Sequence, residues 1–460
     1  MKKILSLILV IVMMCSLLVG CGEQSASEET TEKTNQTEKA ENKSNNETKT
    51  EPTKLVVWGG VPAESGPQDL VDAWNNENPD IQVEYVRFVN DDTGNTKLDT
   101  AILSGEQIDL FFTYTVDLLK KRVDSGMVES LEDAKYQDFI KENIAGEGEG
   151  MVLIDDQLYS IPTVREPFGI MLNKNMLDEK GITIPDGWTV DDYADVAKQL
   201  TGEKDGHTVY GANIIQGGGY PLDIPVTING GDSYYNEAGN ASNFDTPEFD
   251  ASASLKVLMD EGYAMPYEEI FSRKLQVYAH PAFLSEEVAM TSFSAWMLRY
   301  VKDLENYPHD FVTTFAPYPT TENGVENNYQ ASLNNYICMN SNSDEKDAAW
   351  EFMKYWLTDG SKYMYKAGKI SVWKEADPEE ATKVILGDNA EELFDVEAYK
   401  AVIFNPDLEY IVDTITAGYP QLKEIYKEES EMYFLGETTK EEYLKNSKER
   451  SDKAIQAEIK

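Results

Sequence analysis

The sequence predicts an α/β protein with enough chain for two lobes. Strand and helix patterns alternate from residue 54 to residue 114, and this order implies a mainly parallel sheet with right-handed crossovers. Roughly 400 of the 460 residues follow a polar N-terminal segment, which is enough chain for two hydrophobic cores.

The first five elements set the direction of the predicted sheet. Three short apolar strands, at residues 54–58, 81–88 and 108–114, alternate with helices at residues 66–78 and 96–103. Ligands of open α/β sheets bind beyond the carboxyl ends of the strands. Those ends here are Trp58-Gly59-Gly60 and Thr113-Tyr114-Thr115, so we expect a binding site beside them.

The later elements follow from periodicity and helix caps. A hairpin is predicted over residues 151–161, and Thr189 has capping-box spacing to Asp192 at the start of an amphipathic helix. Ser343 is predicted to cap a helix with an apolar stripe that ends at Gly360. Further strands are predicted at residues 168–173, 209–215, 288–294 and 311–316, a helix at residues 246–262, and mainly helix over residues 391–460.

Residues 1–20 are typical of a signal peptide. Lys2 and Lys3 precede an apolar run over residues 4–19, which is short for a membrane span. The run closes on Leu18-Val19-Gly20-Cys21, which resembles the lipobox of bacterial lipoproteins. This resemblance implies that Cys21 is acylated and anchors the protein to the cell membrane on its extracytoplasmic face. An ordinary signal peptide with an incidental cysteine is the alternative.

Residues 21–53 are predicted to join the lipidated Cys21 to the folded part as a disordered tether. The stretch after Cys21 is mainly Ser, Thr, Glu, Lys, Asn and Gln, and it cannot bury enough apolar surface to offset its ordering entropy. A flexible coil of this length averages roughly 30 Å from end to end. Cys338 is then the one cysteine left in the mature domain, and we expect a buried core thiol with no disulfide.

Composition excludes some classes of partner. The formal net charge of −43 argues against binding of nucleic acid and against wide contact with anionic lipid. The chain is also rich in aromatic residues, with 26 Tyr, 7 Trp and 16 Phe. Tyr and Trp offer a flat apolar face and a polar edge, which suits a wet, half-apolar ligand such as a sugar.

Five segments after the tether follow a shared pattern in order and spacing. They are residues 103–112, where Ile108 stands at a usual Pro; residues 158–162 with 172–174; residues 181–189, which end on Trp188-Thr189; residues 283–296; and Ala348-Ala349-Trp350-Glu351-Phe352. Together they resemble the extracellular solute-binding family that includes maltose-binding protein. The resemblance covers nearly the whole chain after the tether.

This resemblance implies a two-lobed periplasmic-binding-protein fold of type II, in which a hinge closes the lobes on a solute. The N-terminal lobe would comprise residues 54–164 and 317–369, and the C-terminal lobe residues 167–314 and 374–460. It also implies a monomer without a cofactor, which captures a mono- or oligosaccharide and delivers it to the permease subunits of an ABC importer.

Nine residues are candidates for contact with the solute: Trp58, Thr113, Tyr114, Arg165, Glu166, Tyr220, Trp296, Asn334 and Trp373. Arg165 and Glu166 suit vicinal hydroxyl groups. Tyr220 follows three glycines that let the backbone approach a solute, and Trp296 matches the cleft Trp of the family. For each candidate, packing or an ordinary surface position is the alternative. Tyr419 and Asn335 are further candidates.

Enzyme chemistry finds little support in the sequence. The three His lack metal-ligand spacing, so we expect no metal site, and neither a nucleophile elbow nor a phosphate-binding loop is present. Two alternatives remain open. One is the same fold with a non-sugar or modified-sugar solute. A strongly anionic solute is disfavoured, because Arg165 is the one cation among the candidate contact residues. The other is a surface glycan hydrolase, which needs two opposed carboxylates.

Overall fold

A computed structural model of the chain describes residues 51–144, 151–216, 219–276, 278–321, 328–405 and 407–459. The predicted signal peptide, Cys21 and most of the predicted tether lie outside these residues. All elements below belong to the unit that starts at Glu51. No helix among the described residues is both long enough and apolar enough to cross a membrane.

The larger sheet has seven strands in the order β15-β6-β14-β3-β1-β2, with β16 paired to β14. β1 (Thr53–Gly59) is parallel to β2 (Ile81–Arg87) and β3 (Leu110–Thr113). β14 (Gln330–Met339) is antiparallel to β3 and to β6 (Ser160–Pro167), β15 (Ile370–Ser371) is antiparallel to β6, and β16 (Glu409–Ile411) is parallel to β14. The predicted parallel arrangement is confirmed for β1, β2 and β3. It is wrong for β14 and β15, which enter from later parts of the chain: β14 runs opposite to β3 and β6, and β15 runs opposite to β6.

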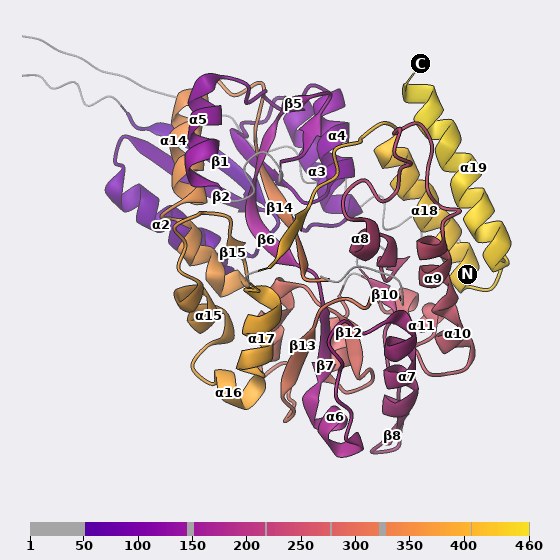
Figure 1. Cartoon of the computed structure of the whole chain (residues 1–460). Coiled ribbons are helices and arrows are strands. Elements are labelled where there is room, and N and C mark those ends of the chain that lie inside the picture. Colours follow the sequence, from indigo (N-terminus) through magenta and orange to yellow (C-terminus); the bar gives the residue numbers. More distant parts are fainter. Residues whose placement is uncertain are drawn as a thin grey trace, which may run out of the picture. The chain divides into compact units, whose positions relative to one another are not determined.

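Helices cover both faces of this sheet (Figure 1). Side chains alternate along a strand, so Leu55 and Val57 of β1 face α2 (Pro67–Glu77) and α14 (Lys346–Leu357). Trp58 faces the opposite way, toward α3 (Asp92–Leu103) and α4 (Val116–Asp124). Each face therefore has a hydrophobic cluster of its own. Cys338 of β14 is buried in the second cluster, and burial raises its pKa to about 12, which confirms the predicted core thiol.

The smaller sheet is antiparallel and has the order β12-β7-β13. Its strands are β7 (Ile170–Asn173), β12 (Met290–Ser292) and β13 (Thr313–Ala316). They belong to a third hydrophobic cluster, which also takes in α7 (Val190–Leu200), α18 (Tyr419–Phe434) and α19 (Lys440–Glu458). The α7 capping box between Thr189 and Asp192 is present as predicted. Figure 1 shows α18 and α19 side by side as an antiparallel pair.

The remaining elements are short connections around these sheets. They are η1 (Ala63–Ser65), α5 (Ala134–Asn143), β4 (Leu153–Ile154), β5 (Gln157–Leu158), α6 (Lys174–Lys180), β8 (Gly202–Lys204), β9 (His207–Val209), β10 (Ile215–Gln216), β11 (Tyr220–Pro221), α8 (Ile224–Asn229), α9 (Pro247–Ser254), α10 (Lys256–Asp260), α11 (Tyr267–Ser272), α12 (His280–Leu284), η2 (Ala295–Met297), α13 (Leu298–Val301), η3 (Ser361–Ala367), α15 (Pro378–Leu386), α16 (Ala390–Leu393) and α17 (Val396–Ile403).

Three sequence-based boundaries need correction. The strand predicted at residues 209–215 divides into β9 and β10, with isolated bridges between them. The helix predicted at residues 246–262 divides into α9 and α10 at Leu255. Ser343 does not cap α14, whose N-cap is Glu345. The Ser343 hydroxyl instead donates to Asp109 Oδ1 (2.6 Å) and accepts from the Glu345 N–H (3.1 Å), because a tertiary partner competes for it.

Candidate functional site

A cavity of about 1160 Å³ lies between elements of the two sheets. One wall comes from the start of α3, the end of β3 and α4, and the base comes from β6 and β14. The opposite wall comes from β11, α8, α11 and α18. Sites for small molecules usually measure about 300–1000 Å³. This cavity therefore has room for a solute of more than one ring.

The wall at the end of β3 is held in place from behind. Buried Arg122 donates from Nε to Asp99 Oδ1 (2.7 Å) and from Nη2 to Asn95 Oδ1 (2.9 Å). The Tyr114 hydroxyl accepts a hydrogen bond from the Gly60 N–H (2.5 Å). A Cβ atom on Gly60 would lie 3.0 Å from the Tyr114 ring, so glycine permits this close approach.

Lys423 of α18 is the central cation of the opposite wall. Its Nζ donates to the Tyr234 hydroxyl (2.9 Å), which donates to Asp223 Oδ2 (2.7 Å). The ammonium lies 4.3 Å from the ring centroid of Tyr220 and 4.2 Å from that of Tyr234, so both rings contribute cation–π attraction. Burial lowers the pKa of Lys423, and the nearby carboxylates, Asp223 first, oppose that shift. Burial raises the pKa of Asp223, and Lys423 opposes it.

Asp413 is a second desolvated carboxylate in this wall. Its Oδ2 accepts a hydrogen bond from the Tyr419 hydroxyl (2.9 Å), and its Oδ1 accepts one from the Asp232 N–H (3.1 Å). Burial raises the pKa of Asp413, and the bond from Tyr419 opposes the rise. Both oxygens are therefore engaged within the protein, and the group orders the wall.

Two exposed aromatic rings line the cavity. Phe271 of α11 is 48% exposed and Tyr278 is 39% exposed. The Tyr278 ring meets the rings of Trp296 and His280 edge-on, with centroid distances of 6.1 and 6.4 Å. A supported ring with an open face can stack on the apolar face of a sugar.

The cavity lining carries an excess of negative charge. Eight acidic side chains and four lysines line it: Asp91, Asp92, Asp99, Asp117, Glu166, Asp223, Asp413 and Glu424, and Lys121, Lys274, Lys423 and Lys427. This balance disfavours an anionic solute, because like charges repel in a partly desolvated site. No group of three or more His, Cys, Asp or Glu in the described part of the chain is placed to hold a metal ion.

Four of the nine predicted contact residues line this cavity, namely Tyr114, Glu166, Tyr220 and Asn334. Glu166 Oε1 also accepts a hydrogen bond from the Ala295 N–H (3.2 Å), which links β6 to the segment after β12. The further candidate Tyr419 also lines the cavity.

Trp58 and Thr113 lie in the core instead. The Trp58 side chain is 4% exposed and packs toward α3, with the Lys97 ammonium 5.5 Å from its ring centroid. Thr113 is fully buried in β3. Strand alternation decides both positions, because a residue at a strand end still faces one side of the sheet.

Arg165, Trp296 and Trp373 also lie outside the cavity lining. Arg165 donates from Nε to the Ser371 carbonyl (3.0 Å) and so joins β6 to β15. Trp296 is half-buried behind Tyr278. Trp373 forms an isolated backbone bridge with Ile144, which places it beside α5.

Sequence reasoning did not single out Asp223, Asp413, Lys423, Phe271 or Tyr278. Lys423 follows Tyr419 at i+4 on one helix, so the helical period could have paired it with that candidate. The other four carry no such signal. Acidic and aromatic residues are too common in this chain for a single one to stand out before the fold brings it to a cavity.

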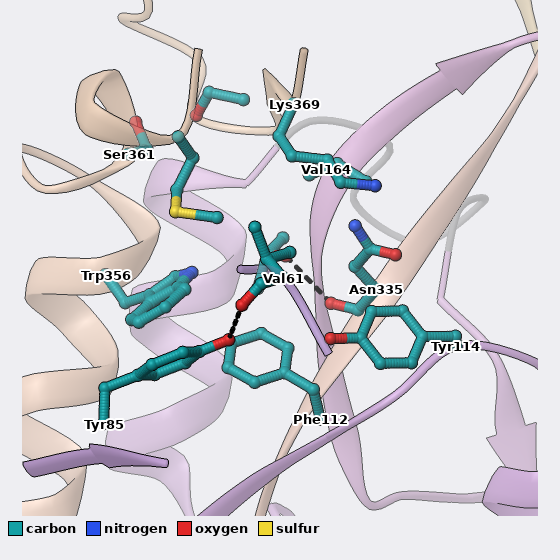
Figure 2. A pocket seen from close by; sticks show the side chains of 12 residues that line it. Val61, Tyr85, Phe112, Tyr114, Val164, Asn335, Trp356, Ser361 and Lys369 are labelled. Atoms are coloured by element: carbon teal, nitrogen blue, oxygen red, sulfur yellow. Dashed lines mark hydrogen bonds between the residues drawn. The ribbon is translucent and has the colours of Figure 1, made fainter. Parts of the chain in front are cut away.

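Figure 2 shows a second, much smaller cavity beside Tyr114. Its volume is about 10 Å³, which is room for about one water molecule. It is lined by Val61, Tyr85, Phe112, Asn335, Trp356 and Lys369, among others. A sugar ring does not fit there, so this cavity is a gap in the packing at the strand ends.

This chain resembles a known protein family and several known proteins. The family model of the bacterial extracellular solute-binding proteins matches residues 59–363. The multiple sugar-binding protein of Streptococcus mutans is 22% identical over 269 residues, which cover 56% of this chain and 60% of that protein.

Solved structures resemble the chain over a larger share. An ABC substrate-binding protein from Listeria monocytogenes in complex with cycloalternan matches with a TM-score of 0.69 and 18% identity, over 88% of this chain and 99% of that one. An ABC transporter solute-binding protein from Thermotoga lettingae, bound with α-D-tagatose, matches with a TM-score of 0.66 and 18% identity, over 88% of this chain and 100% of that one. These likenesses confirm the predicted α/β fold with two lobes.

Proposed function

The chain belongs to the family of bacterial extracellular solute-binding proteins, and we propose that it captures a carbohydrate in the large cavity and hands it to an ABC importer. The proposed solute is a neutral mono- or oligosaccharide. The relatives support this proposal, because the named ligands of two similar structures are cycloalternan and α-D-tagatose.

The composition of the cavity wall carries the proposal. A sugar ring has apolar C–H faces and a polar rim of hydroxyl groups. The cavity offers the exposed rings of Phe271 and Tyr278 for the faces, and Glu166, Asn334 and Lys423 for the hydroxyls. Its excess of carboxylates favours hydroxyl donors over anions.

We propose the remaining features on the basis of the sequence. Cys21 would carry the lipid anchor, the protein would act as a monomer, and permease subunits would be its partners. The N-terminal lobe would comprise residues 54–164 and 317–369, and the C-terminal lobe residues 167–314 and 374–460. The site would bind without catalysis, in keeping with a family of solute-binding proteins.

A sugar panel tests the proposal. The protein is incubated with neutral monosaccharides, neutral oligosaccharides and uronic acids, and both the melting temperature and the products are measured. We expect at least one neutral sugar to raise the melting temperature, because a ligand that binds only the folded state stabilises it. The sugar should be recovered unchanged.

Two results would contradict the proposal. Cleavage of the bound sugar would identify a hydrolase. Stabilisation by the uronic acids alone would replace the neutral solute by an anionic one.

A further inference from the structure

An ion pair between Lys120 and Glu458 joins two helices that lie far apart in the sequence. Lys120 is on α4, and its side chain is 4% exposed. Its Nζ lies 2.8 Å from Oε1 of Glu458, the last residue of α19. The same Nζ lies 3.1 Å from Oδ1 of Asp124, one turn further along α4.

The fully buried side chains of the two helices belong to different cores, and the half-buried Val116 of α4 packs against both. Leu119 of α4 is fully buried in the cluster between the larger sheet and helices α3 and α4. Ile455 of α19 is fully buried in the cluster that contains the smaller sheet. The contact between Lys120 and Glu458 therefore spans the two cores, whereas the contact between Lys120 and Asp124 stays within one helix.

Glu458 also fixes the start of α18. Its Oε2 accepts a hydrogen bond from the N–H of Gly418, the N-cap of that helix. Gly418 has φ +66°, and a Cβ atom there would lie 2.9 Å from the backbone of Ala454. Glycine thus permits the close approach of the two helices. One carboxylate connects Lys120 with the first turn of α18.

The helices joined in this way both contribute to the cavity wall. Asp117 and Lys121 of α4 line the cavity, as do Tyr419 and Lys423 of α18, and the two helices contact each other directly. A charge pair contributes most where it is close and poorly hydrated. If the two cores separate, this pair separates with them, so it stabilises one arrangement of the walls over the other.

We infer that Lys120 and Glu458 are positioning residues for solute binding. Their ion pair holds α18 against α4 and favours the arrangement in which the walls of the cavity face each other, before any solute binds. The ion pair shifts the equilibrium between the arrangement with the two cores together and the arrangement with them apart. The size of the shift is the difference in the free energy of this contact between the two arrangements. The inference goes beyond the proposed function, because it does not depend on which solute the cavity takes.

Single-molecule energy transfer on the solute-free, full-length protein tests this inference. Dyes are attached through Leu103→Cys on α3 and Val257→Cys on α10, because both side chains are exposed, by 67% and 47%. Cys338 is fully buried, and Cys15 and Cys21 are replaced by Ser so that the two introduced thiols take the dyes. The measured quantity is the ratio of molecules whose two dyes are close together to molecules whose dyes are far apart. We expect Glu458→Gln to lower this ratio by about fivefold or more, the usual size of such coupling. Glutamine keeps an acceptor for the Gly418 N–H and removes the charge.

Asp124→Asn is the matched control. It removes the other carboxylate that contacts Lys120. Because Asp124 and Lys120 are on the same helix, this contact does not join the two cores, and the populations should stay as in the wild type. Lys120→Met should shift them as Glu458→Gln does, and the double variant should add nothing, because both changes remove one contact. Unchanged populations in Glu458→Gln, or an equal shift in Asp124→Asn, would overturn the inference. The sugar-panel result has no bearing on this outcome, since no solute is present.

Discussion

At the level of single side chains, the cavity wall combines aromatic rings with an open face and charged groups that already have partners. Phe271 and Tyr278 are exposed, whereas Asp413 and Lys423 make hydrogen bonds within the protein. The open rings gain contact area when a solute binds. The paired charges keep the wall ordered and supply polar contacts at its surface.

Tyr278→Ala should weaken binding of a sugar by about tenfold, since removal of an aromatic anchor from a site costs roughly 1–2 kcal/mol. The melting temperature should change little, because the side chain is 39% exposed. Isothermal calorimetry with a sugar that stabilises the wild type measures the effect. Tyr159→Ala is the control, since Tyr159 is half-buried and outside the cavity lining. Equal losses of affinity in both variants would remove Tyr278 from the site.

His280 should make stability depend on pH. It is 3% exposed, stacks on Tyr300 at a centroid distance of 3.9 Å, and has its pKa lowered to about 4 by burial and then by Arg299. The unfolded chain has a His pKa of about 6.5, so the unfolded state binds the proton more readily between these values. The stability from neutral His280 is fully present above pH 6.5 and is lost as the pH falls toward 4.

The comparison uses His280→Phe, which keeps a flat ring against Tyr300 and has no proton to bind. The free energy of unfolding of the wild type should fall relative to this variant from pH 7 to pH 5, as measured by urea denaturation. Parallel pH profiles for the two proteins would show that His280 does not titrate in this window.

At the level of elements, α18 brings one face to the cavity. Tyr419, Lys423 and Lys427 follow each other at i, i+4 and i+8, so they share one side of the helix, and all three line the cavity. Tyr419 and Lys423 both make hydrogen bonds within the wall, and Lys423 is the cation beside Asp223. The period is visible in the sequence, but the partners come from β11, from the segments on either side of α8 and from the loop before α18.

Lys423→Met should destabilise the fold by roughly 1–3 kcal/mol near pH 7.5, since it leaves Asp223 and Asp413 without their cation. Burial already raises the pKa of both carboxyls, and Lys423 opposes the rise. Without it, both pKa values rise further. A carboxyl whose pKa is raised in the folded state lowers the stability of the protein as the pH rises through that pKa. The stability of Lys423→Met relative to the wild type should therefore fall further from pH 4 toward neutral pH.

Thermal unfolding across this pH range measures the effect of the change. Lys427→Met, one turn further along α18, is the matched control and should leave the melting temperature nearly unchanged. A deficit in Lys423→Met that is the same at every pH would show that the ammonium does not act on these carboxyls.

At the level of the whole molecule, the chain builds two sheets with separate cores and passes between them repeatedly. It leaves the larger sheet after β6, enters the smaller one at β7, and returns after β13 to form β14. The cavity lies between elements of both. A site assembled in this way depends on both cores folding and on how they face each other.

Cys21→Ala tests the proposed attachment of the whole molecule to a membrane. We expect the variant to appear in the medium or to keep an uncleaved signal peptide, because the lipid would be its anchor. Cell fractionation with antibody detection measures the distribution, and Cys338→Ala is the control with an intact Cys21. A mature Cys21→Ala protein that stays as firmly bound as the wild type would contradict lipid anchoring.

The sequence by itself determined the local features. Alternation and periodicity placed β1, β2, β3 and most helices, the spacing of Thr189 and Asp192 gave the α7 cap, and five short segments identified the family. These signals are local, because they depend on side-chain period, on caps and on short patterns within one segment. Tyr114, Glu166 and Tyr220 could be singled out for the same reason, since each stands at the end of an element or beside a recognised segment, whereas Asn334 lies within β14.

Only the tertiary structure decided the rest. It turned β14 and β15 against the parallel strands, sent Trp58 into a core, and brought Asp223, Asp413, Lys423 and Tyr278 to one cavity. The middle of α4 and the end of α19, more than 300 residues apart, meet through Lys120 and Glu458. Contacts of this kind depend on how the two cores pack. Local pattern cannot specify them, because a residue's neighbours across a cavity leave no period or spacing in the sequence.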